Sequence, residues 1–128
     1  MPRFSRVLVV VPPHGSLIVN GTKKALVKSK RYRMEDEPLL VVEKKQAIGR
    51  IVVGAPRTIT LAEFKTLRSW HLVSEEERKR WWGRKTTFYL YPVVSVKKLK
   101  KPVPVDYKNG AQVFVRPESL RVRHIAGH

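Results

Sequence analysis

A dense run of positive charge occupies residues 23–33, within the stretch GSLIVNGTKKALVKSKRYR, and no acid interrupts it before Glu35. Lysine can do two kinds of chemistry here. An exposed ammonium contacts phosphate, whereas a lysine that loses its proton through burial or a cationic neighbour can act as a base. A plain solvated surface is the third interpretation. The cations of this run are Lys23, Lys24, Lys28, Lys30, Arg31 and Arg33.

Lys23 is the residue on which these interpretations differ most. As a phosphate contact it needs only exposure. As a general base it needs a lowered pKa, to which the neighbouring cations Lys24 and Lys28 could contribute. The formal net charge of +17 favours the phosphate interpretation, because lysine and arginine bind nucleic acid mainly by neutralising its phosphates. We therefore predict nucleic-acid contacts along this run.

A second basic run, KKLKK, contributes Lys97, Lys98, Lys100 and Lys101 to the same prediction. Further cations at Lys108, Arg116, Arg121 and Arg123 spread the charge through the last third of the chain. Such a distribution indicates contact on several faces. It is typical of a small protein embedded in ribosomal RNA, and also of a module that grips one long duplex.

Aromatic residues lie among or near these cations and could stack on unpaired bases. Tyr32 is flanked by Lys30, Arg31 and Arg33, although a tyrosine folded back onto the protein is the alternative. Trp81 and Trp82 are adjacent, and consecutive helical residues point about 100° apart, so one shallow core can hardly bury both. We assign Trp82 to the nucleic-acid face, with burial in the core as the alternative.

The composition narrows the function classes. A chain of 128 residues with 42% hydrophobic content suits one domain, spanning 1–128, with one modest core. The positive charge points to an anionic partner, and we expect that partner to be RNA. Absence of cysteine excludes disulfides and thiol catalysis, and the scattered histidines lack metal-ligand spacing, so we expect neither a metal nor a cofactor. His71 is interpreted as a structural histidine.

The N-terminal apolar segment bears on location. It covers only residues 7–11 before Pro12 and Pro13, which is too short for a signal peptide or a membrane span. We expect a cytoplasmic protein with no membrane partner. Asparagine and glutamine are scarce and charged residues are abundant, a composition that is archaeal or thermophile-like.

Short strands with few helices predict an α+β, mainly β fold, a small mixed barrel. Strands are expected at 4–11, 39–43, 47–55, 86–96, 112–116 and 120–123, with a tight connection at 44–46. A basic, proline-broken edge is expected at 97–110, with a Lys-Asn-Gly turn at its end. Residues 15–21 fit either a short helix or a strand. Capping boxes at Thr60 with Glu63, and at Ser74 with Glu77, predict helices over 61–70 and from 75 to the stop at Gly83.

The segment SLIVNGTKKALVKS resembles the signature of the ASCH family, a branch of the PUA-like β-barrels: an apolar helical turn followed by G-x-K-x-x-E-x-R. Gly21, Lys23 and Ser29 match, Lys28 stands where arginine is usual, and Leu26 stands where an acid or hydroxyl is usual. PLLVVEKKQAIGRIVVG and FYLYPVVSVKKLKKPVPV are similar to later strands of the family. HLVSEEERKRWWGRKTTFYLYPV resembles a block of small PUA-like proteins of archaea and phages. The resemblance covers roughly residues 5 to 105.

This resemblance implies a PUA-like (ASCH-type) pseudo-barrel with two or three short helices, in which residues 21–28 line a cleft. It implies binding of RNA or modified bases. Some ASCH members are amidohydrolases of acylated nucleosides or ribonucleases, and the lysine matching Lys23 is catalytic in them. Leu26 can neither orient a nucleophile nor relay a proton, which weighs against catalysis unless another acid, such as Glu43 or Glu63, faces Lys23.

Three functions remain open at this point. The first is a protein that grips structured RNA through its phosphates, in a ribosomal or RNA-processing setting. The second is an ASCH-type hydrolase that uses Lys23 on a modified nucleoside or RNA. The third is a DNA-binding accessory protein.

Overall fold

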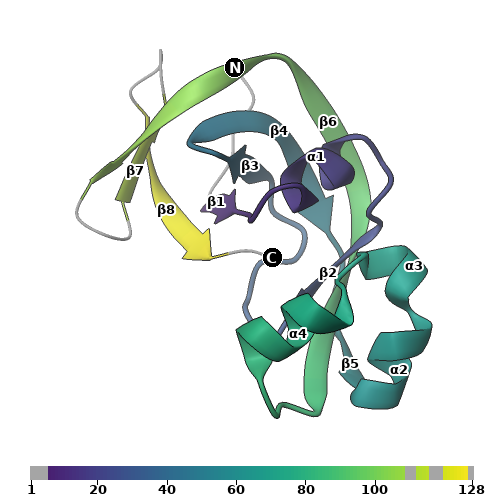
Figure 1. Ribbon diagram of the computed structural model, residues 1–128. Coiled ribbons are helices and arrows are strands. Elements are labelled where there is room, and N and C mark those ends of the chain that lie inside the picture. The colour runs from purple at the N-terminus through teal and green to yellow at the C-terminus, as the bar shows by residue number, and fades with distance from the viewer. Residues whose placement is uncertain (1–5, 109–111, 116–119, 127–128) are drawn as a thin grey trace.

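The computed structural model describes residues 6–108, 112–115 and 120–126, with side chains described for residues 6–105 (Figure 1). It is mainly β, as predicted. Along the chain the elements are β1 (Arg6–Val9), α1 (His14–Val19), β2 (Ala25–Lys28), β3 (Leu39–Glu43), β4 (Gln46–Val53), β5 (Arg57–Thr60), α2 (Leu61–Thr66), α3 (Arg68–His71), α4 (Glu75–Trp82), β6 (Thr87–Lys108), β7 (Gln112–Val115) and β8 (Leu120–Ala126).

The strands form one strongly curled sheet in the order β2-β6-β4-β3-β1-β8-β7, and β7 pairs back onto β6 to close the pseudo-barrel. β1 runs parallel to both β3 and β8, and the other pairings are antiparallel. In Figure 1 helices α2, α3 and α4 gather at one end of the molecule, around β2, β5 and the start of β6. The described residues hold four short helices rather than the predicted two or three.

The long strand β6 connects all parts of the sheet. It pairs with β2 and β5 over its first residues, then with β4, and finally with β7. The prediction of a separate, proline-broken edge after residue 96 is wrong. The pairing with β4 shifts register between Ala47 and Gly49, whose partners are Val103 and Lys98, so Pro102 falls in a bulge, where its missing N–H breaks no ladder bond. The predicted Asn109-Gly110 turn lies outside the described residues.

Local signals placed several elements correctly. Both predicted capping boxes are present, with the Thr60 and Ser74 side chains each accepting from the backbone N–H of the glutamate three residues later. The β3–β4 hairpin turns through Lys44 and Lys45, both at positive φ, as a tight two-residue turn requires. Residues 14–19 are helical, which settles the choice left open for that segment. β2 and β5, of four residues each, were not predicted.

Strand β2 lies between two apolar cores because its side chains alternate across the sheet. Leu26 packs into the barrel core with Ile18, Val41 and Tyr91. Ala25 and Val27 face the second core, formed with residues of the helices α2 and α4. A third, smaller apolar cluster lies around Val42 and Val105. The residues that flank β2 are therefore held at the junction between the barrel and the helices.

Helix α1 packs closely on the barrel. A Cβ at Gly49 of β4 would lie 2.6 Å from a Val19 methyl and 2.9 Å from the carbonyl oxygen of Lys97. Only glycine permits this approach. The turn that follows α1 uses Gly21 at φ +80 and leads directly to the residues before β2.

Candidate functional site

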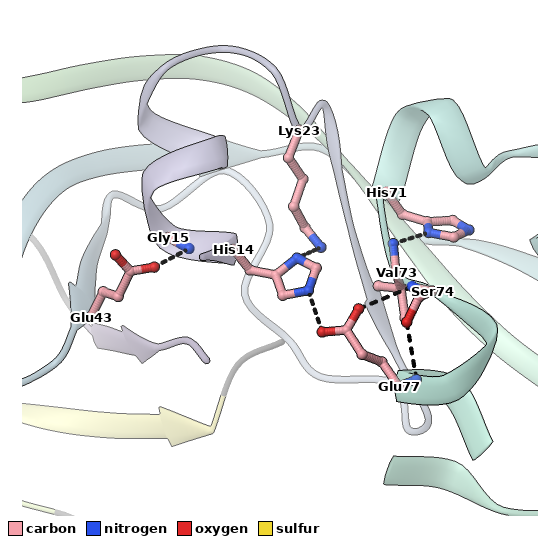
Figure 2. A network of polar contacts seen from close by, with 8 residues as sticks. All are labelled: His14, Gly15, Lys23, Glu43, His71, Val73, Ser74 and Glu77. Carbon is pink, nitrogen blue, oxygen red and sulfur yellow. Dashed lines mark hydrogen bonds and ion pairs between the residues drawn. The ribbon is translucent and has the colours of Figure 1, made fainter. Parts of the chain in front are cut away.

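Lys23 is buried where the turn after α1 meets β2. Its backbone N–H donates to the Leu17 carbonyl at 2.9 Å, which fixes the chain direction. Its side chain is only 1% exposed, and Nζ lies 2.9 Å from Nδ1 of His14 (Figure 2). The exposure that a phosphate contact requires is absent, because the ammonium group points inward. The structure thus corrects the prediction that Lys23 presents its charge at the surface.

His14 connects Lys23 to a carboxylate. It is the first residue of α1, is 1% exposed, and places Nε2 2.9 Å from Oε2 of Glu77 on α4. The edge of Trp81 closes one side of the ring, with centroids 5.7 Å apart. A carboxylate accepts, so Nε2 carries the hydrogen of a neutral ring and Nδ1 accepts from Lys23. Figure 2 shows the resulting chain from Lys23 through His14 to Glu77, which we name the buried relay.

Glu77 serves two partners with its two oxygens. Oε1 accepts from the backbone N–H of Ser74 at 3.0 Å, and Ser74 Oγ accepts from the Glu77 N–H at 3.1 Å, which completes the capping box of α4. Oε2 is left to accept from His14. The cap therefore fixes the carboxylate in the position that the buried relay needs, so Glu77 does more than complete the predicted capping box.

Glu43 holds α1 in place from the other side. Its Oε1 accepts from the backbone N–H groups of Gly15 at 2.9 Å and Ser16 at 3.2 Å, and its Oε2 accepts from Ser16 Oγ at 2.7 Å. A side chain at Gly15 would come within 3.0 Å of Glu43. Glu43 thus caps α1 and orients His14. Neither it nor Glu63, the capping residue of α2, is the acid bonded into the buried relay.

Burial dominates the electrostatics of the site. It lowers the pKa of Lys23 to about 7, against the raising effect of Glu77 and with some help from Lys28. Burial, followed by the charge of Lys23, also lowers the pKa of His14. At Glu77 burial works to raise the pKa, but hydrogen bonds from Ser74 and His14 outweigh it, and the pKa is lowered. A neutral lysine and a charged carboxylate are accessible together near pH 7.

Lys28 is the second interior lysine. It lies at the end of β2 in register with Tyr89, is 2% exposed, and places Nζ 5.8 Å from the centre of the Tyr32 ring. Burial lowers its pKa to about 7. Like Lys23, it does not present its charge at the surface, which corrects the predicted phosphate contact.

The remaining predicted cations are exposed, and their contact with nucleic acid stays a prediction. They are Lys24, Lys30, Arg31, Arg33, Lys97, Lys98, Lys100 and Lys101. Tyr32 is 37% exposed, and its backbone N–H and carbonyl both bond the hydroxyl of Tyr91 at 2.6 Å. The other predicted cations, Lys108, Arg116, Arg121 and Arg123, have side chains outside the described residues.

Trp82 does not lie on a binding face. It is 9% exposed and packs against Phe64 and Phe88 in the core under the helices, with ring centroids 6.1 and 5.4 Å away. The prediction that it stacks on a base is therefore wrong, because two helical residues 100° apart find two separate neighbours: Trp82 the apolar core and Trp81 the His14 ring. The exposed tryptophan is Trp70, at 46%.

Two groups of cations are candidate binding surfaces. The loop surface comprises Lys30, Arg31 and Arg33, together with Lys85, whose Nζ donates to the Ser29 carbonyl at 3.3 Å. The strand surface comprises the exposed Lys97, Lys98, Lys100 and Lys101, together with Arg50, which is half-buried. Tyr89, opposite the end of β2, and Lys97, opposite Arg50, are separated by eight residues along β6. At about 3.3 Å per residue these two positions are separated by roughly 26 Å of strand, measured along β6.

His71 is structural, as predicted. Its Nε2 bonds the Phe64 carbonyl at 2.7 Å, its Nδ1 accepts from the Val73 N–H at 2.9 Å, and its ring stacks on Phe64. Burial lowers its pKa to about 4. No group of side chains that could hold a metal ion occurs within the described part of the chain. None of the helices described is long and apolar enough to cross a membrane.

Comparison with known proteins identifies the fold through solved structures and finds no match by sequence. No protein-family model matches the chain, and no curated protein sequence matches it. The crystal structure of the ASCH protein from Zymomonas mobilis aligns over 97% of this chain and 100% of its own, with a TM-score of 0.67 and 13% identity. A serine-to-alanine mutant of the Zymomonas mobilis protein aligns over 80% of this chain and 75% of its own, with a TM-score of 0.65 and 15% identity. The chain therefore has the fold of these ASCH structures, a mainly β, curled pseudo-barrel.

Proposed function

We propose that this protein is an RNA-binding domain that contacts phosphates through the loop surface and the strand surface, in a ribosomal or RNA-processing setting. The observation that carries the proposal is the pairing of Arg50 with Lys97, directly opposite each other on β4 and β6. Like charges in that position destabilise a sheet. An anionic ligand that neutralises both supplies a reason for keeping them.

The bulge in β6 adds to this argument. Lys100 and Lys101 lie between Lys98 and Val103, the residues of β6 that pair with β4 on either side of the register shift. Both lysines are exposed. Lys98 donates to the Asn20 side chain at 3.1 Å, beside the turn that leads to Lys23. The ASCH-type fold, which in the resemblance given above implies RNA or modified-base binding, supports RNA over DNA as the partner.

The test is the salt dependence of RNA affinity. Binding of a fluorescent structured RNA is measured between about 50 and 200 mM salt, where neutralising six to ten phosphates costs roughly 10³- to 10⁵-fold in affinity. Two matched variants, one with Arg31→Gln and Arg33→Gln and one with Lys100→Gln and Lys101→Gln, should each flatten the slope by about two. An affinity that does not change with salt would overturn the proposal, and co-purification with ribosomes at high salt tests the setting.

A second candidate function is hydrolysis of a modified nucleoside or RNA, and the buried relay is the observation that favours it. A lysine with a pKa of about 7, backed by a histidine and a carboxylate, has the order of groups found in activated nucleophiles. Leu26 is fully buried in the barrel core and takes no part. Because Lys23 is covered, a substrate would have to displace the side chains around it.

This second function is tested with Lys23→Arg. Arginine keeps the positive charge but stays protonated, so it cannot act as a base or nucleophile. Turnover of an acylated nucleoside by the natural protein that disappears in this variant would establish catalysis at Lys23. No turnover in the natural protein would leave RNA binding as the function of the domain.

A further inference from the structure

We propose that His14 is a proton acceptor for Lys23: the proton on Nζ passes to Nδ1 of His14, Glu77 holds the imidazolium so formed, and Lys23 is left as a free amine inside the protein. The inference deepens the second candidate function above, and in that respect rests on it, but the proton transfer itself requires no substrate. His14 is thereby a positioning residue, acting through Lys23.

The transfer neither takes up nor releases a proton, because the proton stays within three side chains. Before it, Lys23 is an ammonium, His14 is neutral with hydrogen on Nε2, and Glu77 is a carboxylate. After it, Lys23 is an amine, the His14 ring is charged, and Glu77 is unchanged. Both arrangements carry no net charge, so neither adds an unpaired charge to the interior. The distances, 2.9 Å on either side of the ring, allow the transfer without movement of heavy atoms.

The surroundings fix the direction in which the ring is used. Nε2 must keep its hydrogen because Glu77 Oε2 accepts, and Glu77 cannot turn away because its other oxygen caps α4. The remaining charged or titratable groups that act on this cluster are Glu43, Lys28 and His71. Glu43 favours a charged His14, whereas Lys28 opposes a charged Lys23. Burial lowers the pKa of both groups, and these two further influences favour passing the proton from lysine to histidine.

The experiment follows the two nitrogens in the full chain without any ligand. Nitrogen-15 spectra of the histidines report the tautomer and charge of His14, and the carbon-13 shift of Cε reports the charge of Lys23, assigned with Lys23→Arg. We expect Nε2 of His14 to be protonated throughout. Below pH 7 the Nδ1 shift should lie between those of an acceptor and a protonated nitrogen, and it should move to the acceptor value at the same midpoint as Lys23.

A variant pair separates the relay from the general effect of charge. In Glu77→Gln the amide oxygen can still accept from Ser74, but its NH₂ donates to His14, so hydrogen should move to Nδ1 and face Lys23. The Lys23 midpoint should then fall by about one pH unit. Glu76→Gln removes an exposed charge from the same helix without touching His14, and should change neither nucleus.

Each outcome decides the proposal. Nδ1 at the acceptor value throughout, or the same His14 tautomer in Glu77→Gln as in the natural protein, would overturn it even if nucleoside hydrolysis were found. A shared midpoint would establish the transfer even if no hydrolysis were found. Melting curves of both variants check that the spectra come from folded protein. If hydrolysis exists, Glu77→Gln should lower kcat with little change in KM.

Discussion

Lys23 and Lys24 are neighbours in the chain, but their surroundings in the folded molecule differ completely. Lys24 is exposed, whereas Lys23 is almost fully covered and bonded to a histidine. The same contrast separates the buried relay from the loop and strand surfaces. On the surfaces a cation keeps its ordinary charge and can meet phosphate. Inside, the same ammonium becomes a group that titrates near neutral pH, because burial disfavours its charged form.

The largest effect expected from this difference is on stability against pH. The pKa of Lys23 and of Lys28 is about 7 in the folded protein, against about 10.4 in an unfolded chain. Between those values the unfolded chain binds more protons, so the free energy of unfolding rises with pH, by about 1 kcal/mol per pH unit for each lysine. The contribution of these two lysines to the free energy of unfolding does not change below pH 7. It reaches its full value above about 10.4, the pKa of lysine in the unfolded chain. Urea unfolding at pH 7 and pH 9 should differ by roughly 4 kcal/mol.

The two lysine types provide the control for this measurement. Lys28→Met, which keeps the length of the side chain without its charge, should remove about half of the slope. Lys24→Met should leave the slope as it is, because Lys24 is exposed in the folded and the unfolded chain alike. A free energy of unfolding that does not change from pH 7 to pH 9 contradicts the burial of these lysines.

Next in size is the effect of Trp82→Ala. Removing a buried tryptophan from the core under the helices should cost about 3–5 kcal/mol of stability. RNA affinity per folded molecule should stay unchanged, since the ring is not on a binding face. Trp70→Ala is the matched control and should alter stability by less than about 0.5 kcal/mol. A Trp82→Ala protein that is as stable as the natural one but binds RNA weakly would restore the stacking role.

The two capping boxes give a smaller and more selective comparison. Ser74→Ala and Thr60→Ala each remove the side chain that accepts from the N–H of a helix start, at a cost of about 1 kcal/mol. Only the first lies beside the buried relay, because Glu77 also bonds His14 whereas Glu63 does not. Ser74→Ala should therefore broaden or shift the His14 signals, and Thr60→Ala should leave them alone. Equal effects on His14 would show that Glu77 is held by something other than its cap.

The smallest effect concerns single exposed cations. Lys98→Gln on the strand surface should reduce the salt slope of RNA binding by about one. Lys65→Gln serves as the control, because Lys65 is exposed on α2 and lies 3.4 Å from Glu75, outside both surfaces. A Lys65→Gln slope that changes as much as that of Lys98→Gln would mean that binding follows total charge and has no defined surface.

Much of the fold could be predicted because its signals are local. A few consecutive residues are enough to indicate each of these features: β3, the turn at Lys44 and Lys45, and the caps at Thr60 and Ser74. β2 and β5 could not be predicted, since four residues carry no periodicity and both exist through pairing with β6. The continuity of β6 depends likewise on its partners, which absorb Pro102 in a register shift.

The candidate site was predicted only in part, for a related reason. Charge density and the resemblance to ASCH proteins both singled out Lys23. Burial decides what that lysine does, and no sequence pattern shows that a turn residue will lie under α1. His14 and Glu77 are 63 residues apart, so no spacing rule joins them. The one available signal was Glu77 itself, which the capping box fixes in space.

The parallel pairing of β1 with β8 has a consequence for how the protein is made. Arg6 pairs with Arg123, so the second edge of β1 stays uncovered until almost the whole described chain has left the ribosome. At 5–20 residues per second this takes on the order of ten seconds. Throughout that time an apolar parallel strand, Val7 and Leu8 included, is open to pairing with other chains. Synthesis speed over the last third of the chain should therefore govern the yield of folded protein, and slow translation there should favour aggregation.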